Sequence, residues 1–280
     1  PDYKDARVAL ADLKLARGDV AGARETLGPE LLAAQGDSDV AGLLQRMDDA
    51  AATARWRLDA SALLSNLSDG LPEWKEANLS VSRKIAARSA LTARVQQIER
   101  FAIDETYLEA EFDHGWTGGE WAVTIGGSLD PTFRAERAIK ASVLLIPKKN
   151  SPWRLGADVN YSHYVGADVT TVRAGVDRYI DGDRGLVSLR AIETSDPIGK
   201  RLWGGSIDGS WRFTDRIEAS GSYVNAAETD SGVVVRTSAC GGALAYKLSE
   251  RTTLQATLLE EMRDNSYDRL EFGLGVTLRF

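Results

Sequence analysis

The stretch LEFGLGVTLRF, which runs from Leu270 to Phe280, decides the fold of this chain. Its even-numbered positions are all apolar and its odd-numbered ones are small or polar, in the order Leu270, Glu271, Phe272, Gly273, Leu274, Gly275, Val276, Thr277, Leu278, Arg279, Phe280. A strict period of two is the pattern of a β-strand, because successive side chains of a strand point to opposite faces. The segment therefore predicts a strand with one apolar face.

The same alternation recurs in earlier parts of the chain, over residues 203–213, 153–162, 121–126 and 56–65. Clusters of turn-forming residues lie between such runs, at 68–70, 147–150, 181–183, 214–215, 249–250 and 264–266. Counting the runs predicts about fourteen strands, within a range of about 12 to 16, since bacterial single-chain barrels prefer even numbers. We expect a mainly β fold, a transmembrane antiparallel up-and-down β-barrel over residues 54–280. A soluble β-sandwich is the structural alternative.

Two features favour lipid over a dry core on the apolar side. Aromatic residues stand at strand ends, where interfacial girdles place them, and we expect these to lie at the membrane interface: Trp56, Trp121, Trp153, Trp211, Phe213 and Phe280. The opposite face carries more charge than a dry core tolerates. We expect that face to line a lumen, through Arg57, Asp59, Glu109, Glu111, Arg154, Asp158, Arg173, Asp177, Asp208, Arg212, Glu271 and Arg279.

The first 53 residues belong to a different class, rich in Ala, Leu, Asp, Glu and Arg. Apolar spacing over residues 5–35 predicts two amphipathic helices joined at Gly18-Asp19, and a third helix from about Asp39 to Ala54. Small residues at Ala11 and Ala23, with Leu27 one turn later, resemble one tetratricopeptide repeat. One repeat cannot bury its own apolar face, so we expect further repeats before Pro1 or docking on the barrel mouth. A simple helical linker is the alternative.

Composition excludes other classes of protein. No run approaches the roughly 18 to 20 apolar residues of a transmembrane helix, which excludes a helical membrane protein. The net charge of −7 argues against a nucleic-acid binder, which would present a basic face. The single cysteine, Cys240, excludes an intramolecular disulfide.

Candidate catalytic and metal-binding groups are few. Alternation places Ser162 and His163 on opposite faces, which argues against a serine hydrolase, and His114 lies near a turn. A ladder of carboxylates on one face is formed by Glu109, Glu111 and Asp113. We expect these carboxylates to form ion pairs with residues such as Arg94, and we favour this over a role in catalysis or calcium binding. Residues 181–183 form a turn without the other ligands of a calcium loop. We expect no enzyme activity, no cofactor and no metal.

Two longer motifs carry a resemblance to known families. The run from Asp69 to Ser82, DGLPEWKEANLSVS, followed by Arg94, Phe101 and Asp104, resembles the start of YaiO-type outer-membrane β-barrels. With the repeat-like first segment, it is also similar to the repeat-plus-barrel export porins of bacterial exopolysaccharides. The terminal aromatic Phe280 resembles the assembly signal of bacterial outer-membrane proteins. These resemblances imply an outer-membrane location, with residues 1–53 in the periplasm.

The resulting hypotheses differ in class. The first is an outer-membrane pore that exports an exopolysaccharide, whose partners are membrane lipid, the polysaccharide, and periplasmic or inner-membrane export proteins that contact residues 1–53. In that case Tyr107 and Tyr179 are expected to stack on sugars. The second is a closed structural or adhesion barrel that acts through protein interactions, and the third is a lipid-modifying enzyme.

Overall fold

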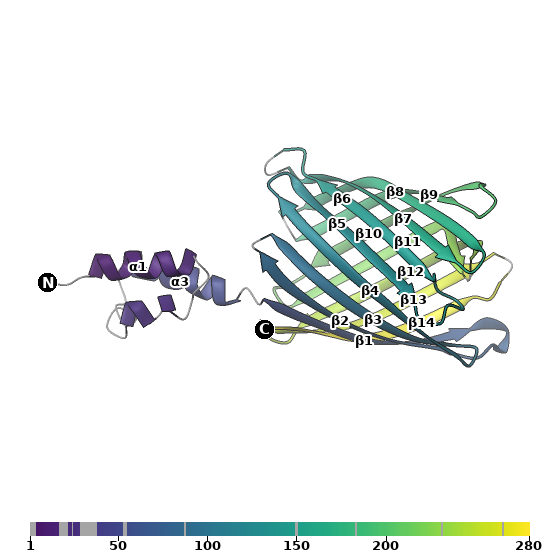
Figure 1. Cartoon of the computed structure of the whole chain (residues 1–280), viewed down its shortest axis with the longest axis horizontal. Coiled ribbons are helices and arrows are strands. Elements are labelled where there is room, and N and C mark those ends of the chain that lie inside the picture. The colour runs from purple at the N-terminus through teal and green to yellow at the C-terminus, as the bar shows by residue number, and fades with distance from the viewer. Residues whose placement is uncertain are drawn as a thin grey trace. The chain divides into compact units, whose positions relative to one another are not determined.

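A computed structural model describes residues 4–16, 22–23, 25–28, 38–52, 55–86, 88–148, 151–182, 184–230, 232–264 and 266–280. The chain forms two compact units, Pro1–Arg55 and Trp56–Phe280 (Figure 1). The change of composition near Ala54 marks this division to within two residues. Each unit is described separately below.

The first unit is helical. Its helices are α1, Lys4–Ala16, and α3, Ser38–Ala52, with further helical residues at 22–23 and 25–28. A small core is formed by Ala11, Ala23, Leu27, Leu43 and Met47. The two alanines permit close approach, as the sequence predicts, and the junction predicted at Gly18-Asp19 lies outside the described residues. Neither described helix is long and apolar enough to cross a membrane.

The second unit is a closed antiparallel β-barrel of 14 strands (Figure 1). The strands are β1 Trp56–Leu67, β2 Trp74–Ala86, β3 Ser89–Arg100, β4 Ile103–Trp116, β5 Gly119–Ser128, β6 Arg137–Leu145, β7 Trp153–Tyr164, β8 Ala167–Ile180, β9 Gly185–Ser195, β10 Arg201–Arg212, β11 Ile217–Asp230, β12 Val233–Lys247, β13 Thr252–Arg263 and β14 Arg269–Arg279. Each strand pairs with its neighbours in sequence, so the predicted up-and-down topology is confirmed. The sandwich alternative is wrong, because closure leaves no second sheet.

The barrel closes between its first and last strands. The register runs from Arg57 opposite Arg279 to Leu67 opposite Arg269. Side chains reinforce this seam, since Thr277 Oγ1 donates to Asp59 Oδ1 at 2.5 Å and Ser65 Oγ donates to Glu271 Oε2 at 3.0 Å. The alternating last strand therefore completes the barrel, as predicted.

The barrel has two ends, which we name by the seam strands. At the proximal mouth β1 begins and β14 ends, and at the distal mouth β1 ends and β14 begins. Two-residue connections occur at both, for example 117–118 at the proximal mouth and 101–102 and 165–166 at the distal mouth. Short turns therefore do not distinguish the two mouths.

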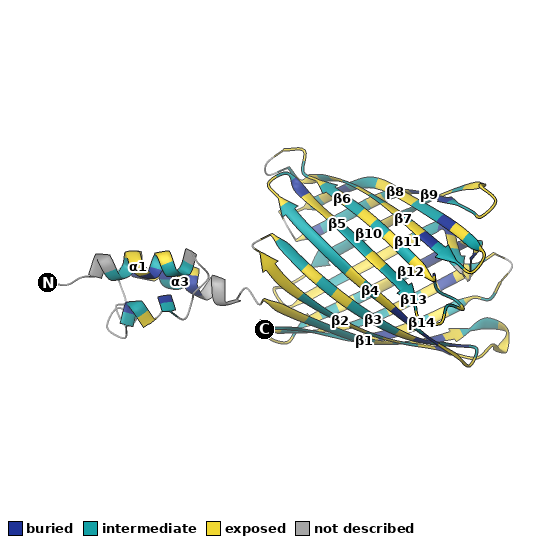
Figure 2. Cartoon of the chain, viewed as in Figure 1, coloured by how far each residue is buried: buried dark blue, intermediate teal, exposed yellow. Residues whose placement is uncertain are grey.

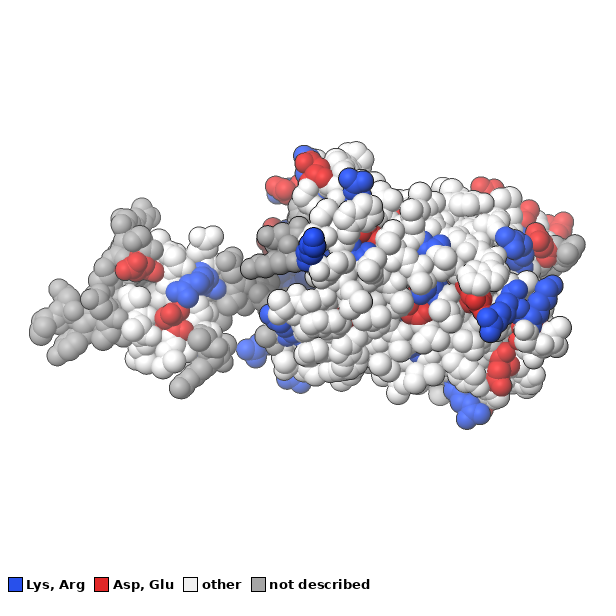
Figure 3. Space-filling model, turned by 90° about the horizontal axis from the view of Figure 1, so that it is seen from above, with Lys and Arg blue, Asp and Glu red and all other residues white. Residues whose placement is uncertain are grey.

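The two faces of the wall differ in chemistry. Large apolar side chains such as Leu79, Ile125, Ile207 and Leu274 are exposed, and alternation assigns them to the outer face (Figure 2). On the face that Figure 3 shows, most of the surface between the two ends of the barrel is uncharged, with a few charged atoms in the middle and more of them toward the ends. An apolar belt of this kind is the surface that lipid requires.

Candidate functional site: the barrel interior and its distal mouth

All the residues predicted to line a lumen belong to the alternate set that faces the barrel interior. The register brings several of them together across neighbouring strands: Arg57 lies opposite Arg279, and Arg154 lies opposite Asp177. Asp158 likewise lies opposite Arg173. Alternation in the sequence was enough to predict which face each residue occupies, before the register of neighbouring strands was known.

One part of the interior wall, from β3 to β9, is held by ion pairs. Arg94 Nη1 lies 2.5 Å from Glu109 Oε2, so the expected pairing of Arg94 with the carboxylate ladder is present. Glu111 accepts from Thr124 Oγ1 at 3.0 Å. Asp177 pairs with Arg190, a residue that the sequence analysis had not selected. These contacts leave the wall charged in both signs and suited to water.

The wall formed by β10 to β13 is smoother. Beside the first cavity its inner side chains are small, at Ser210, Ser220, Ser222, Gly241 and Thr257, with Asp208 and Leu259 next to them. They border a cavity of about 430 Å³, and further cavities of about 370 and 310 Å³ lie against β4–β9 and against the β13–β14–β1–β3 wall. The interior therefore retains open volume beside a surface of small, mixed side chains.

The distal mouth is narrowed by the connection 129–136, between β5 and β6. Glu105, on β4, is only 2% exposed and accepts backbone hydrogen bonds from Thr132, Phe133 and Arg134, the shortest being 2.7 Å from Phe133 N. Arg134 Nη2 lies 3.6 Å from Glu76 Oε2 on β2. A carboxylate with several N–H donors is a strong anchor. It fixes this connection, here called the anchored loop, against the inner wall.

Aromatic and arginine side chains form a cluster beside the anchored loop. We call it the distal cluster; its aromatic members are Trp74, Phe101, Phe133 and Tyr267, and its basic members are Arg100, Arg134, Arg263 and Arg269. Trp74 is 3% exposed, and Arg100 Cζ lies 4.0 Å from its ring centroid. Phe101 adopts a left-handed φ of 52°, which is costly for a bulky residue. Its edge-on contacts with Trp74 and Tyr267 offset that cost.

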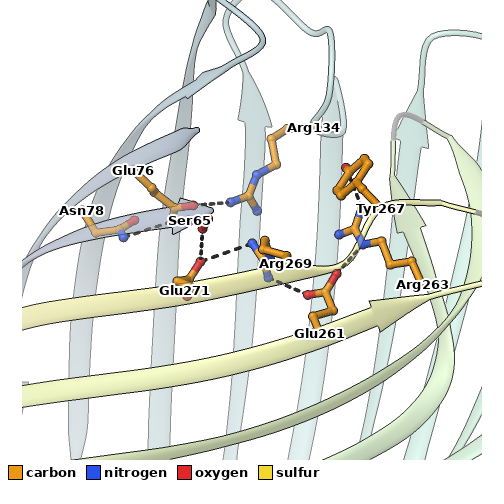
Figure 4. Close-up of polar contacts among 9 residues, drawn as sticks. All are labelled: Ser65, Glu76, Asn78, Arg134, Glu261, Arg263, Tyr267, Arg269 and Glu271. Carbon is orange, nitrogen blue, oxygen red and sulfur yellow. Dashed lines mark hydrogen bonds and ion pairs between the residues drawn. The ribbon is translucent and has the colours of Figure 1, made fainter. Parts of the chain in front are cut away.

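Carboxylates connect the distal cluster to the seam (Figure 4). Arg269 lies between Glu261 and Glu271, at 2.6 and 3.2 Å, and Arg263 pairs with Glu261 and donates to Tyr267 Oη at 2.9 Å. The charges are thus mutually compensated, which is what burial requires. This part of the mouth is filled by the protein itself.

No member of the distal cluster was predicted as a site residue, although Glu271, which pairs with Arg269, was. Glu105 continues the inward alternation of Glu109 and Glu111, and that signal would have placed it inside. Trp74 follows the turn at 68–70 and would have been assigned to the interface. The anchored loop could not have been found, because its fold depends on a carboxylate that lies far away in the sequence.

The two tyrosines expected to stack on sugars differ. Tyr107 is 6% exposed and Arg134 covers its ring, with Cζ 5.7 Å from the centroid, so the expectation for Tyr107 is wrong. Tyr179 is half-buried, with Arg154 Cζ 4.5 Å from its centroid. One face of each ring is therefore occupied by a guanidinium.

The predicted interface aromatics all lie near the proximal mouth. Trp56, Trp121, Trp153, Phe213 and Phe280 are exposed, and Trp211 is half-buried. They form one girdle at one end of the barrel, which the sequence order alone did not show. At the other end Trp203 and Tyr161 are exposed.

The two histidines differ, since His163 contacts a carboxylate and His114 contacts a serine hydroxyl, which no described carboxylate extends into a triad. His163 Nδ1 lies 2.6 Å from Asp168 Oδ1 on the outer face, whereas Ser162 is buried in the inner set and accepts from Asn160. His114 Nδ1 lies 2.9 Å from Ser89 Oγ, also on the outer face. Asp181 forms an ion pair with Arg184, as expected of a turn.

Comparison with known proteins bears on the fold. No family model matches the chain, and no curated protein is significantly similar to it in sequence. Solved structures do match. The fold is that of outer-membrane β-barrels.

Three of these structures are informative. A bacterial polysaccharide outer membrane secretin is 12% identical, with a TM-score of 0.58 over 81% of this chain and 99% of that one. The CymD monoaromatic hydrocarbon channel is 9% identical, with a TM-score of 0.61 over 81% and 89%. The outer membrane protein Omp33 of Acinetobacter baumannii is 10% identical, with a TM-score of 0.53 over 81% and 100%. At such identities the likeness concerns the fold alone.

Proposed function

We propose that this chain is an outer-membrane pore for polar solutes, and that its cargo is an exopolysaccharide. The observation that carries the proposal is the division of the barrel wall into an apolar outer belt and an inner face of charges and hydroxyls around open cavities. Such a wall is stable only between lipid and water. A catalytic role is disfavoured because His163 and Ser162 point to opposite faces.

The polysaccharide cargo is supported by the small inner side chains beside the cavity of β10 to β13. Ser210, Ser220 and Thr257 offer hydroxyl donors and acceptors near Asp208, and weak contacts of this kind suit passage of a sugar chain that must bind and leave. The fold shared with a polysaccharide secretin is consistent with this cargo. Residues 1–53 would lie in the periplasm and receive export proteins, in keeping with their repeat-like sequence.

A closed structural barrel is the second candidate. The distal cluster favours it, because Trp74, Arg100 and Glu105 fill part of one mouth with compensated groups. The cavities along the interior favour the pore.

Liposome swelling tests the cargo. Vesicles that hold the refolded chain are diluted into monosaccharides or into oligosaccharides of increasing length, and swelling rates are compared with those of empty vesicles. We expect swelling with the small sugars and inhibition by added exopolysaccharide. Swelling that the polymer does not inhibit would contradict the proposed cargo and leave the pore intact.

A further inference from the structure

Two arginines at the proximal mouth lie over tryptophan rings on the outer face. Arg83 stands opposite Trp56 in the register of β1 and β2, and its Cζ lies 5.1 Å from the ring centroid. Arg178 stands opposite Trp153 across β7 and β8, again with Cζ at 5.1 Å. The same arrangement thus occurs twice on the barrel. We call these the Arg–Trp pairs.

The two guanidiniums lack an anionic partner. Both arginines are exposed, and within the part of the chain that the structure describes neither forms an ion pair with a carboxylate. Arg184, which lies over Trp211 at 6.0 Å, differs in pairing with Asp181 at 3.5 Å. The cation–π contact orients Arg83 and Arg178 but leaves their N–H donors available.

Outer-face charges are distributed differently at the distal mouth. The acidic residues that alternation places on the outer face of the described strands all lie in the distal half: Glu99, Asp104, Asp168, Glu193 and Glu260. Several are paired there, as in Lys75–Glu99 at 3.4 Å and Arg201–Glu193 at 3.3 Å. The outer face of the described strands thus carries acids among its bases in the distal half, and bases without acids in the proximal half.

The surface next to each Arg–Trp pair is apolar. Toward the middle of the barrel, the next outer residues are Leu58 and Val81 beside the first pair, and Leu155 and Val176 beside the second. A ligand that contacts both the guanidinium at the rim and the apolar residues next to it needs an anionic head and a hydrocarbon tail. A phosphate accepts paired N–H donors from a guanidinium, and acyl chains cover the apolar residues.

We propose that the Arg–Trp pairs bind the phosphate of an anionic phospholipid, and so anchor the proximal mouth in a phospholipid leaflet. The inference rests on the membrane placement proposed above and does not require an open pore. A basic side chain next to an anionic lipid surface strengthens their association by about a factor of five. We therefore expect anionic lipid to be enriched around the Arg–Trp pairs by about fivefold.

Brominated lipids test the proposal through quenching of tryptophan fluorescence. The full chain is refolded into phosphatidylcholine vesicles that contain brominated phosphatidylglycerol or, separately, brominated phosphatidylcholine, and relative affinities follow from the quenching curves. We expect the wild type to prefer phosphatidylglycerol by about fivefold. The double variant R83Q/R178Q should lose this preference, and R137Q/R201Q, which removes two outer-face arginines at the distal mouth, should keep it.

Heat-modifiability on gels and conductance are measured in the same vesicles. A folded, conducting wild type without lipid preference would overturn the lipid proposal alone, as would an unchanged preference in R83Q/R178Q. Failure of a folded barrel to insert would contradict the membrane placement itself.

Discussion

Glu105 holds the anchored loop through its carboxylate. It is buried, and three consecutive backbone N–H groups of the anchored loop donate to it. Hydrogen bonds to a charged group contribute roughly 1.5 to 3 kcal/mol each to stability, and more is lost when the donors stay buried. The position of the loop therefore depends on this single side chain to an unusual degree.

Replacing Glu105 with Ala should release the anchored loop. We expect larger and noisier single-channel currents, because loss of roughly 1.5 to 3 kcal/mol shifts the loop from its inner position by a factor of about 10 to 100. The Asp130→Asn variant, an exposed site on the same loop, serves as the control. Equal conductance in both variants would show that the loop does not restrict the path.

Leu274 tests the outer face at a single position. It lies in the middle of β14, is 57% exposed, and has only apolar outer neighbours at Ala62 and Ala256. Arg at this site should lower the free energy of unfolding in vesicles by roughly 2 to 4 kcal/mol, as a charge does near a bilayer midplane. Gln255→Arg, one step away on the inner face, should cost little. The measurement is urea denaturation in lipid, and a cost at Gln255 as large as at Leu274 would argue against the assigned faces.

At the scale of elements, the strands were predictable and the mouths were not. Alternation fixes which face a residue occupies, so the charges of β7 and β14 could be assigned before any pairing was known. The turn at 101–102 carries Phe101 and Ala102 in left-handed conformations that favour Gly or Asn, and so gave no turn signal. The distal cluster joins β2, β3, β13, β14 and three connections, and contacts so distant in sequence leave no local pattern.

The helical unit is the second element-scale question. Residues 1–55 have their own small core around Leu27, Leu43 and Met47, and the barrel closes through β1 and β14 without them. A chain lacking residues 1–55 should therefore refold into vesicles with unchanged heat-modifiability and conductance. A truncated barrel that aggregates or fails to insert would show that the helices take part in barrel assembly.

The proposed pore requires that the barrel wall as a whole separate two environments. Its outer face must contact lipid and its inner face must contact water. The sequence predicted both faces, because a period of two sorts side chains without reference to the third dimension. It could not predict how far the interior is filled, since that depends on which inner side chains pair with each other. The cavities and the distal cluster both depend on this pairing of inner side chains, so neither could be predicted from the sequence.

A water path through the barrel is measured as single-channel conductance of the purified full chain in a planar bilayer. We predict steady, ohmic current steps, which a water path through the cavities of the interior would carry. A chain that is folded, heat-modifiable and inserted, yet passes no current at any applied voltage, would contradict the pore and identify the barrel as a closed one.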